Sequence, residues 1–326
     1  MLPDKKEVHY GSRKMRKIIV MFIIVSFVTS CKSLKKQVIN NEYEKDFAAR
    51  EAPYDNCFAI LPFTLNYTQS GCYPIIKINN SFLLLDTGAN FTCVSEKGVL
   101  DLFYNSYEVV KQQKMLMQED GNINICNQQI GYWTIPSYDG ANKNIPFYYT
   151  NYDFSIFDGL VGQDCFTEFS NIIIDYKNKV IVFDGENIKG EEMPMFIDAE
   201  GLCFIEFTCN GIKETGLIDT GSQYFILRSS FFEKACEYSH MSASEIEELK
   251  NRKINLTEPT NYLFREVKIG KNRYKKMKAK LASDSQIRMS DEARGRLSEY
   301  SSLGFPFFEN KIIQLDFRNK IFRIKK

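Results

Sequence analysis

Apolar residues alternate with turn residues along most of the chain, and one arrangement of them occurs twice. Residues 74–89 read PIIKINNSFLLLDTGA and residues 204–222 read FIEFTCNGIKETGLIDTGS. In each copy a strand-like run, a turn containing Asn and a second apolar run lead into Asp-Thr-Gly and a small residue. This pattern predicts a β-hairpin. A short helical pattern follows each copy, at 95–103 and at 228–238.

The two copies also end alike. Residues 158–183 contain DGLVGQDCF and then NIIIDYKNKVIVF, and residues 302–324 contain SLGFPFF and then KIIQLDFRNKIFRI. A repeated start and a repeated end indicate one unit used twice. Because each unit consists mainly of short strands joined by Gly, Asn and Pro turns, the sequence predicts an all-β fold of two pseudo-symmetric, β-barrel-like lobes with a few short helices. The main exception is a helical pattern at 231–253.

The N-terminal segment has the pattern of an export signal. A basic cluster at 13–17 precedes an apolar run at 18–28, which is too short to span a bilayer comfortably, and Thr29-Ser30-Cys31 follows. This order resembles a bacterial lipoprotein signal with a lipobox. The resemblance implies cleavage before Cys31 and lipidation of that residue, which would hold the protein on a membrane of the cell envelope, facing the periplasm or the surface. An uncleaved membrane anchor is the alternative hypothesis.

These patterns divide the chain into four predicted parts. Residues 1–31 are a signal segment with its lipobox, and residues 32–50 are a polar tether. Residues 51–190 form an N-terminal lobe with the first Asp-Thr-Gly, and residues 191–326 form a C-terminal lobe with the second. Two lobes in one chain remove the need for a dimer, so we expect a monomer.

The amino-acid composition limits the kinds of partner and catalytic site that the protein can have. The chain has 42 basic and 41 acidic residues, a formal charge of +1, and this balance gives no reason to expect a nucleic-acid partner. Its two histidines are His9, which lies in the predicted signal segment, and His240. So few histidines exclude a multi-His zinc site and disfavour a Ser-His or Cys-His enzyme. We therefore expect no metal or cofactor, and any hydrolytic chemistry would depend on carboxylates.

Eight cysteines follow Cys31, and the sequence leaves their state open. An even number in an exported protein permits disulfides, whereas buried free thiols are the alternative. The eight are Cys57, Cys72, Cys93, Cys126, Cys165, Cys203, Cys209 and Cys236.

Both Asp-Thr-Gly motifs place a carboxylate directly after an apolar strand. A carboxylate is poorly placed there unless it is paired or hydrogen-bonded. The glycine lets each loop turn sharply and approach another closely. If pseudo-twofold symmetry brings the loops together, Asp86 and Asp219 become neighbours that cannot both ionise easily. The ionised member could then take a proton from a water while the protonated member polarises a substrate carbonyl.

These residues resemble pepsin-like and retropepsin-like aspartic peptidases, in which such a carboxylate pair is well known. The resemblance covers nearly the whole mature chain, about residues 55–185 and 200–326, and rests on LLLDTGA, LIDTGS and a later apolar-apolar-Gly in each lobe. It implies two lobes of acid-protease type. It also implies an aspartic-type peptidase that hydrolyses a polypeptide substrate through a water held by Asp86 and Asp219.

The resemblance also assigns roles to the residues beside the aspartates. It implies that Thr87 and Thr220 hydrogen-bond across the lobe interface. It implies that Gly88 and Gly221 shape the loops and direct backbone N–H groups toward the carboxylates.

The residue after each Asp-Thr-Gly differs between the lobes. Ser222 could donate a hydrogen bond to Asp219, whereas Ala89 cannot do this for Asp86. Fewer donors would lower the pKa of a carboxyl less, so we expect activity to extend toward neutral pH.

Two further segments complete the resemblance. The later segment that threads beside the aspartate loop is Leu160-Val161-Gly162 in the first lobe and Ser302-Leu303-Gly304 in the second, where Ser replaces an apolar residue. The candidate flap is the hairpin pattern at 115–126, and its turn consists of Glu119, Asp120, Gly121 and Asn122.

A fold does not determine a function. The alternative hypothesis is a catalytically inactive peptide- or partner-binding envelope lipoprotein on the same fold.

Overall fold

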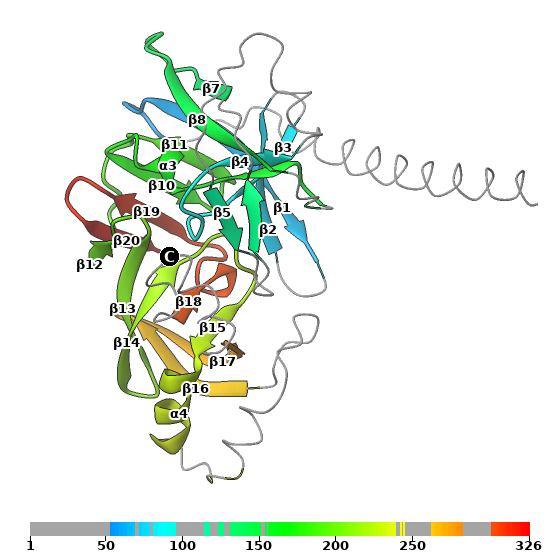
Figure 1. The fold of residues 1–326 in the computed structure, drawn as a ribbon. Helices are drawn as coiled ribbons and strands as arrows, with labels where there is room; N and C mark the ends of the chain where they lie inside the picture. The colour runs from blue at the N-terminus through cyan, green and yellow to red at the C-terminus, as the bar shows by residue number, and fades with distance from the viewer. Residues whose placement is uncertain are drawn as a thin grey trace, which may run out of the picture. The chain divides into compact units, whose positions relative to one another are not determined.

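One strand pattern, used twice, accounts for most of the described secondary structure (Figure 1). The computed structural model describes residues 53–68, 72–78, 81–95, 114–117, 123–126, 131–150, 154, 156–238, 242, 244, 262–282 and 301–326. Residues 49–326 form one compact unit.

The first lobe contains strands β1–β11 and one short helix. Their bounds are β1 Ala59–Tyr67, β2 Cys72–Ile78, β3 Ser81–Leu85, β4 Cys93–Ser95, β5 Lys114–Met117, β6 Ile123–Cys126, β7 Gly131–Ile135, β8 Lys143–Thr150, β9 Gly159–Val161, α3 Gln163–Phe166, β10 Asn171–Asp175 and β11 Val180–Phe183.

The second lobe contains strands β12–β20, a helix and a 3₁₀ turn. Their bounds are β12 Glu191–Ile197, β13 Cys203–Cys209, β14 Ile212–Ile218, β15 Phe225–Arg228, α4 Ser229–Tyr238, β16 Tyr262–Ile269, β17 Asn272–Ala282, β18 Ser301–Leu303, η2 Phe305–Phe307, β19 Ile312–Asp316 and β20 Ile321–Lys325.

The two lobes pair their strands in the same way. The hairpin β2–β3 corresponds to β13–β14, and both are antiparallel. Strand β9 runs parallel to β3 and antiparallel to β4, and β18 has the same relation to β14 and β15. The prediction of an all-β fold with two pseudo-symmetric, barrel-like lobes is therefore confirmed. Of the predicted helices, 228–238 corresponds to α4, whereas most of 95–103 and the later part of 231–253 lie outside the described residues.

Six strands from both lobes form one shared sheet. Pairings between neighbours give the order β1-β11-β10-β19-β20-β12, so β10 and β19 lie side by side where the lobes meet (Figure 1). Ile174 pairs with Ile313 and Ile172 with Leu315, and all four side chains are fully buried in the main core. Apolar burial of this extent is the principal force holding the lobes together.

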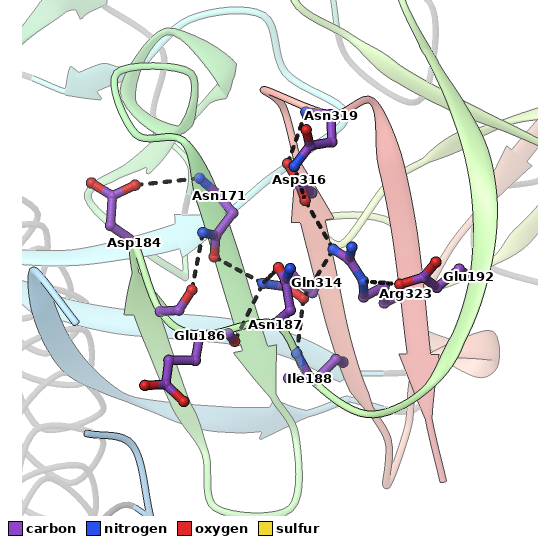
Figure 2. Close-up of polar contacts among 11 residues, drawn as sticks. Asn171, Asp184, Glu186, Asn187, Ile188, Glu192, Gln314, Asp316, Asn319 and Arg323 are labelled. Carbon is purple, nitrogen blue, oxygen red and sulfur yellow. Dashed lines mark hydrogen bonds and ion pairs between the residues drawn. The ribbon is translucent and has the colours of Figure 1, made fainter. Parts of the chain in front are cut away.

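A buried polar network joins this sheet to the connection between the lobes (Figure 2). The Gln314 amide donates to Asn171 Oδ1 at 3.0 Å and accepts from the Ile188 N–H at 3.1 Å. Beside it, Arg323 donates to Asp316 Oδ2 at 2.9 Å and to Glu192 Oε1 at 2.8 Å. Because buried polar groups are costly unless they are paired, this network fixes how the connecting segment crosses the sheet.

Arg323→Ala is expected to lower the free energy of unfolding by about 3–5 kcal/mol, because it leaves the buried Asp316 carboxylate without its cationic partner. Urea denaturation would measure the change. Arg318→Ala removes an exposed guanidinium from the neighbouring turn and should change stability by no more than about 0.5 kcal/mol. Equal effects of the two variants would contradict the role assigned to the network.

Six cysteines whose side chains the structure describes are free thiols. Cys57 is half-buried, and Cys72, Cys93, Cys165, Cys203 and Cys209 are buried. They act there as small apolar side chains.

No helix in the described part of the chain is long and apolar enough to cross a membrane.

Candidate active site

Two equivalent loops carry the aspartates. Asp86 directly follows β3, and Asp219 directly follows β14. The Asp86 N–H donates to Val161 O at 3.0 Å, and the Asp219 N–H donates to Leu303 O at 3.1 Å. Each aspartate thus extends the parallel pairing with β9 or β18 by one hydrogen bond, which fixes where its side chain begins.

Threonine side chains tie the two loops together. Thr87 Oγ1 donates to Ile218 O at 2.7 Å and accepts from the Thr220 N–H at 3.0 Å. The reciprocal bonds join Thr220 Oγ1 to Leu85 O at 2.7 Å and to the Thr87 N–H at 3.0 Å. Both threonines are fully buried. Four hydrogen bonds across the lobe interface, in water-excluded surroundings, hold the loops in one relative position.

The glycines of the motifs let the aspartates approach each other. A Cβ added at Gly88 would lie 2.5 Å from Asp219 Cγ, and one added at Gly221 would lie 2.6 Å from Asp86 Oδ1. Any other residue would therefore collide with the opposite carboxyl. Each carboxyl thus lies against the opposite loop, so the structure brings together the two carboxylates that the sequence singled out.

Backbone and side-chain donors surround the pair. The Gly88 N–H donates to Asp86 Oδ1 at 2.9 Å, and the Ser222 N–H donates to Asp219 Oδ1 at 2.9 Å. The Ser302 hydroxyl donates to Asp219 Oδ2 at 2.9 Å. Both oxygens of Asp219 are therefore hydrogen-bonded.

The role expected for the Ser222 side chain needs correction. Its hydroxyl bonds the backbone of Tyr224, accepting from the N–H at 3.2 Å and donating to the carbonyl at 3.3 Å. Only its backbone N–H reaches Asp219. The hydroxyl is used to stabilise the local turn, a common alternative for serine. Ala89 lies beside the apolar cluster of the first lobe and carries no hydroxyl.

Burial and hydrogen bonding act in opposite directions on Asp219. Desolvation raises the pKa of the Asp219 carboxyl above its ordinary value. The Ser302 hydroxyl, the Ser222 N–H, the Asp86 side chain and the Gly221 N–H oppose this rise, because they favour the charged form. Both aspartates nevertheless keep intermediate exposure, so the pair is enclosed but accessible. A pair with these properties can hold one shared proton.

The segments predicted to thread beside the aspartate loops do so. A Cβ added at Gly162 would lie 2.5 Å from Phe91 O, and one added at Gly304 would lie 2.6 Å from Ser222 O. Ser302, two residues before Gly304, was noted in the sequence only as a departure from an apolar pattern. Its contact with Asp219 was missed, although a hydroxyl at an otherwise apolar position was the available signal.

Other predicted site residues lie partly or wholly outside the described chain. Strands β5 and β6 pair antiparallel as the flap pattern predicts, with Met115 opposite Ile125. The turn residues Glu119–Asn122 and the lipidation residue Cys31 are outside the described residues, so their roles stay predictions. Within the described ranges, no group of three or more His, Cys, Asp and Glu side chains could hold a metal ion.

Comparison with solved structures shows which proteins share the fold. The chain is similar in fold to basic 7S globulin from soybean, with a TM-score of 0.50, 9% identity, and coverage of 82% of this chain and 94% of that one. It is also similar to edgp, with a TM-score of 0.50, 12% identity, and coverage of 83% and 95%. Conglutin gamma, a basic 7S globulin from lupine seeds, has a TM-score of 0.49, 9% identity, and coverage of 82% and 95%. At such identities the likeness concerns the fold.

The comparisons correct the family expected from the sequence. No protein-family model matches the chain, and no curated protein matches it. The similar structures with a TM-score of 0.50 are a soybean globulin and edgp. Membership of the pepsin-like or retropepsin-like peptidase family is therefore a wrong prediction. Two Asp-Thr-Gly motifs in a duplicated β fold were enough to suggest that family but are too short to establish it.

Proposed function

We propose that the chain hydrolyses peptide bonds with Asp86 and Asp219 as its acid–base pair. One observation carries the proposal. Two partly exposed carboxyl groups each lie against the loop that carries the other, and buried threonine bonds between the loops hold them in place. Holding two carboxyl groups of like charge close together lowers the stability of the fold. Groups held at such a cost are concentrated at functional sites.

The geometry suits attack by water on a carbonyl group. A water between the carboxyls would give a proton to the ionised aspartate while its oxygen bonds to the peptide carbon. The carbonyl oxygen would take the proton of the other aspartate. As the tetrahedral intermediate collapses, the C–N bond breaks and the departing nitrogen takes a proton from one aspartate. A hydroxyl of the intermediate returns its proton to the other aspartate as the carbonyl group of the new carboxylic acid forms. The pair returns to its starting state with one proton, so no cofactor is needed.

A second candidate is a protein that binds a peptide or another partner without cleaving it. Its support is that the fold is shared with proteins named as globulins, so the fold alone does not imply hydrolysis. The proposal of peptide hydrolysis therefore rests on the carboxyl pair and not on the similarity in fold to these proteins.

Incubation of residues 32–326, which retain the whole compact unit, with a denatured protein would separate the two candidates. The assay would run from pH 3 to pH 8, with fragments identified by mass spectrometry. Cleavage that a statine-type inhibitor blocks is the expected result. Peptide binding without cleavage at any pH would reject hydrolysis and favour the binding protein.

A further inference from the structure

Ser302 lies between the two strands that flank the Asp219 loop. On β18 it is opposite Leu217 of β14 in parallel register and opposite Ile226 of β15 in antiparallel register. Strand β14 leads into Asp219, and β15 begins soon after it. From this position the Ser302 hydroxyl reaches Asp219 Oδ2 at 2.9 Å while its own side chain stays partly exposed.

The first lobe shows that the fold does not require a hydroxyl at this position. Leu160 of β9 has the same register, opposite Leu84 of β3 and opposite Cys93 of β4. It is buried in an apolar cluster of that lobe. A leucine therefore satisfies the same backbone pairing. The serine occurs at only one of these two equivalent positions, so strand pairing does not explain it. Its contact with the Asp219 carboxylate does.

The hydroxyl supplies something that the backbone does not. The Ser222 N–H occupies Oδ1 of Asp219, and Ser302 occupies Oδ2. Donors on both oxygens restrict rotation of the carboxylate about the Cβ–Cγ bond, and loss of the donor to Oδ2 would relax this restriction. A donor to a carboxylate also favours its charged form.

We propose that Ser302 is a positioning residue, whose hydroxyl orients the Asp219 carboxylate and holds it in the ionised form that accepts a proton. The contribution of Ser302 to catalysis rests on the proposed hydrolysis, but its effect on the Asp219 carboxylate does not. The competing explanation is that Ser302 merely fills space between β14 and β15. Truncation would then lower stability equally at all pH values.

The first test uses the pH dependence of cleavage by residues 32–326. Ser302→Ala should lower kcat/KM by roughly 10- to 100-fold on the acidic side of the profile, since a hydrogen bond to a charged group is lost. The acidic limb should move to higher pH. Ser302→Thr keeps a hydroxyl at the strand position and should restore the wild-type profile. An unchanged profile for Ser302→Ala in an active enzyme would overturn the proposal.

The second test needs no activity. Loss of the donor raises the pKa of the Asp219 carboxyl further, so the folded chain keeps its proton to higher pH than the unfolded chain does. Stability of Ser302→Ala relative to the wild type should therefore fall as pH rises from 4 to 8. In urea denaturation the gap between the two midpoints should widen over this range, and it should stay constant when both chains also carry Asp219→Asn.

Ser222→Ala is the matched control for this titration, because its hydroxyl bonds the Tyr224 backbone and its N–H to Asp219 remains. Its midpoint gap should not depend on pH. If the Ser302→Ala gap is equally constant, the proposal is rejected whether or not the wild type cleaves peptides. A wild type that does not cleave, combined with a widening gap, would reject hydrolysis and keep the effect on Asp219.

Discussion

Asp86→Asn and Asp219→Asn are each expected to lower kcat/KM for cleavage of a denatured protein by about 10³-fold or more. Either change removes one of the two groups between which the proton moves, and an amide replaces neither an acid nor a base. The two side chains act as a unit, so the double variant should be hardly less active than either single one. Initial rates of peptide release, at the pH optimum of the wild type, would measure the loss.

The control for this experiment is Asp139→Asn, which changes an exposed carboxylate in the β7–β8 connection and should leave the rate unaltered. Near-native structure of all variants can be checked by circular dichroism. Residual cleavage at wild-type rates in either aspartate variant would assign the activity to other residues or to a contaminant.

Gly88→Ala and Gly221→Ala should be nearly as damaging, although neither side chain takes part in chemistry. The added Cβ would lie 2.5 Å from Asp219 Cγ or 2.6 Å from Asp86 Oδ1, which forces the loops or carboxyls apart. A displacement of about 1 Å is enough to cost roughly 100-fold in rate. Overpacking should also lower the free energy of unfolding by about 1–3 kcal/mol. Cleavage assays and urea denaturation would measure the two effects.

Gly185→Ala provides a matched glycine control. Its added Cβ would first meet the ends of the Ile173 and Val182 side chains, which can shift, and neither residue belongs to an aspartate loop. We expect unchanged activity for this variant. If Gly88→Ala and Gly221→Ala were equally active, the close approach of the loops would not be needed for the function.

The sequence predicted the features that depend on short stretches of chain. Apolar runs on either side of an Asn-containing turn defined the hairpins, and repetition identified Asp86 and Asp219 as equivalent positions. The β10–β19 pairing was not predicted, because NIIID and IIQLD are apolar runs that could each pair with many strands. Nor was the hydroxyl of Ser222 or that of Ser302 placed correctly. Which donor reaches a carboxylate depends on side-chain direction and register, and both are set by long-range packing.

The shared sheet has a consequence for the order in which the protein folds. Strand β10 lies between β11 and β19, and β19 is about 140 residues further along the chain. Until β19 and β20 have been synthesised, β10 remains a hydrophobic edge with unpaired N–H and C=O groups, which is a template for aggregation. Closing so long a loop is slow. Loss of Ile312–Lys325 would therefore leave an aggregation-prone first lobe, and a chaperone that shields β10 would be most useful before synthesis ends.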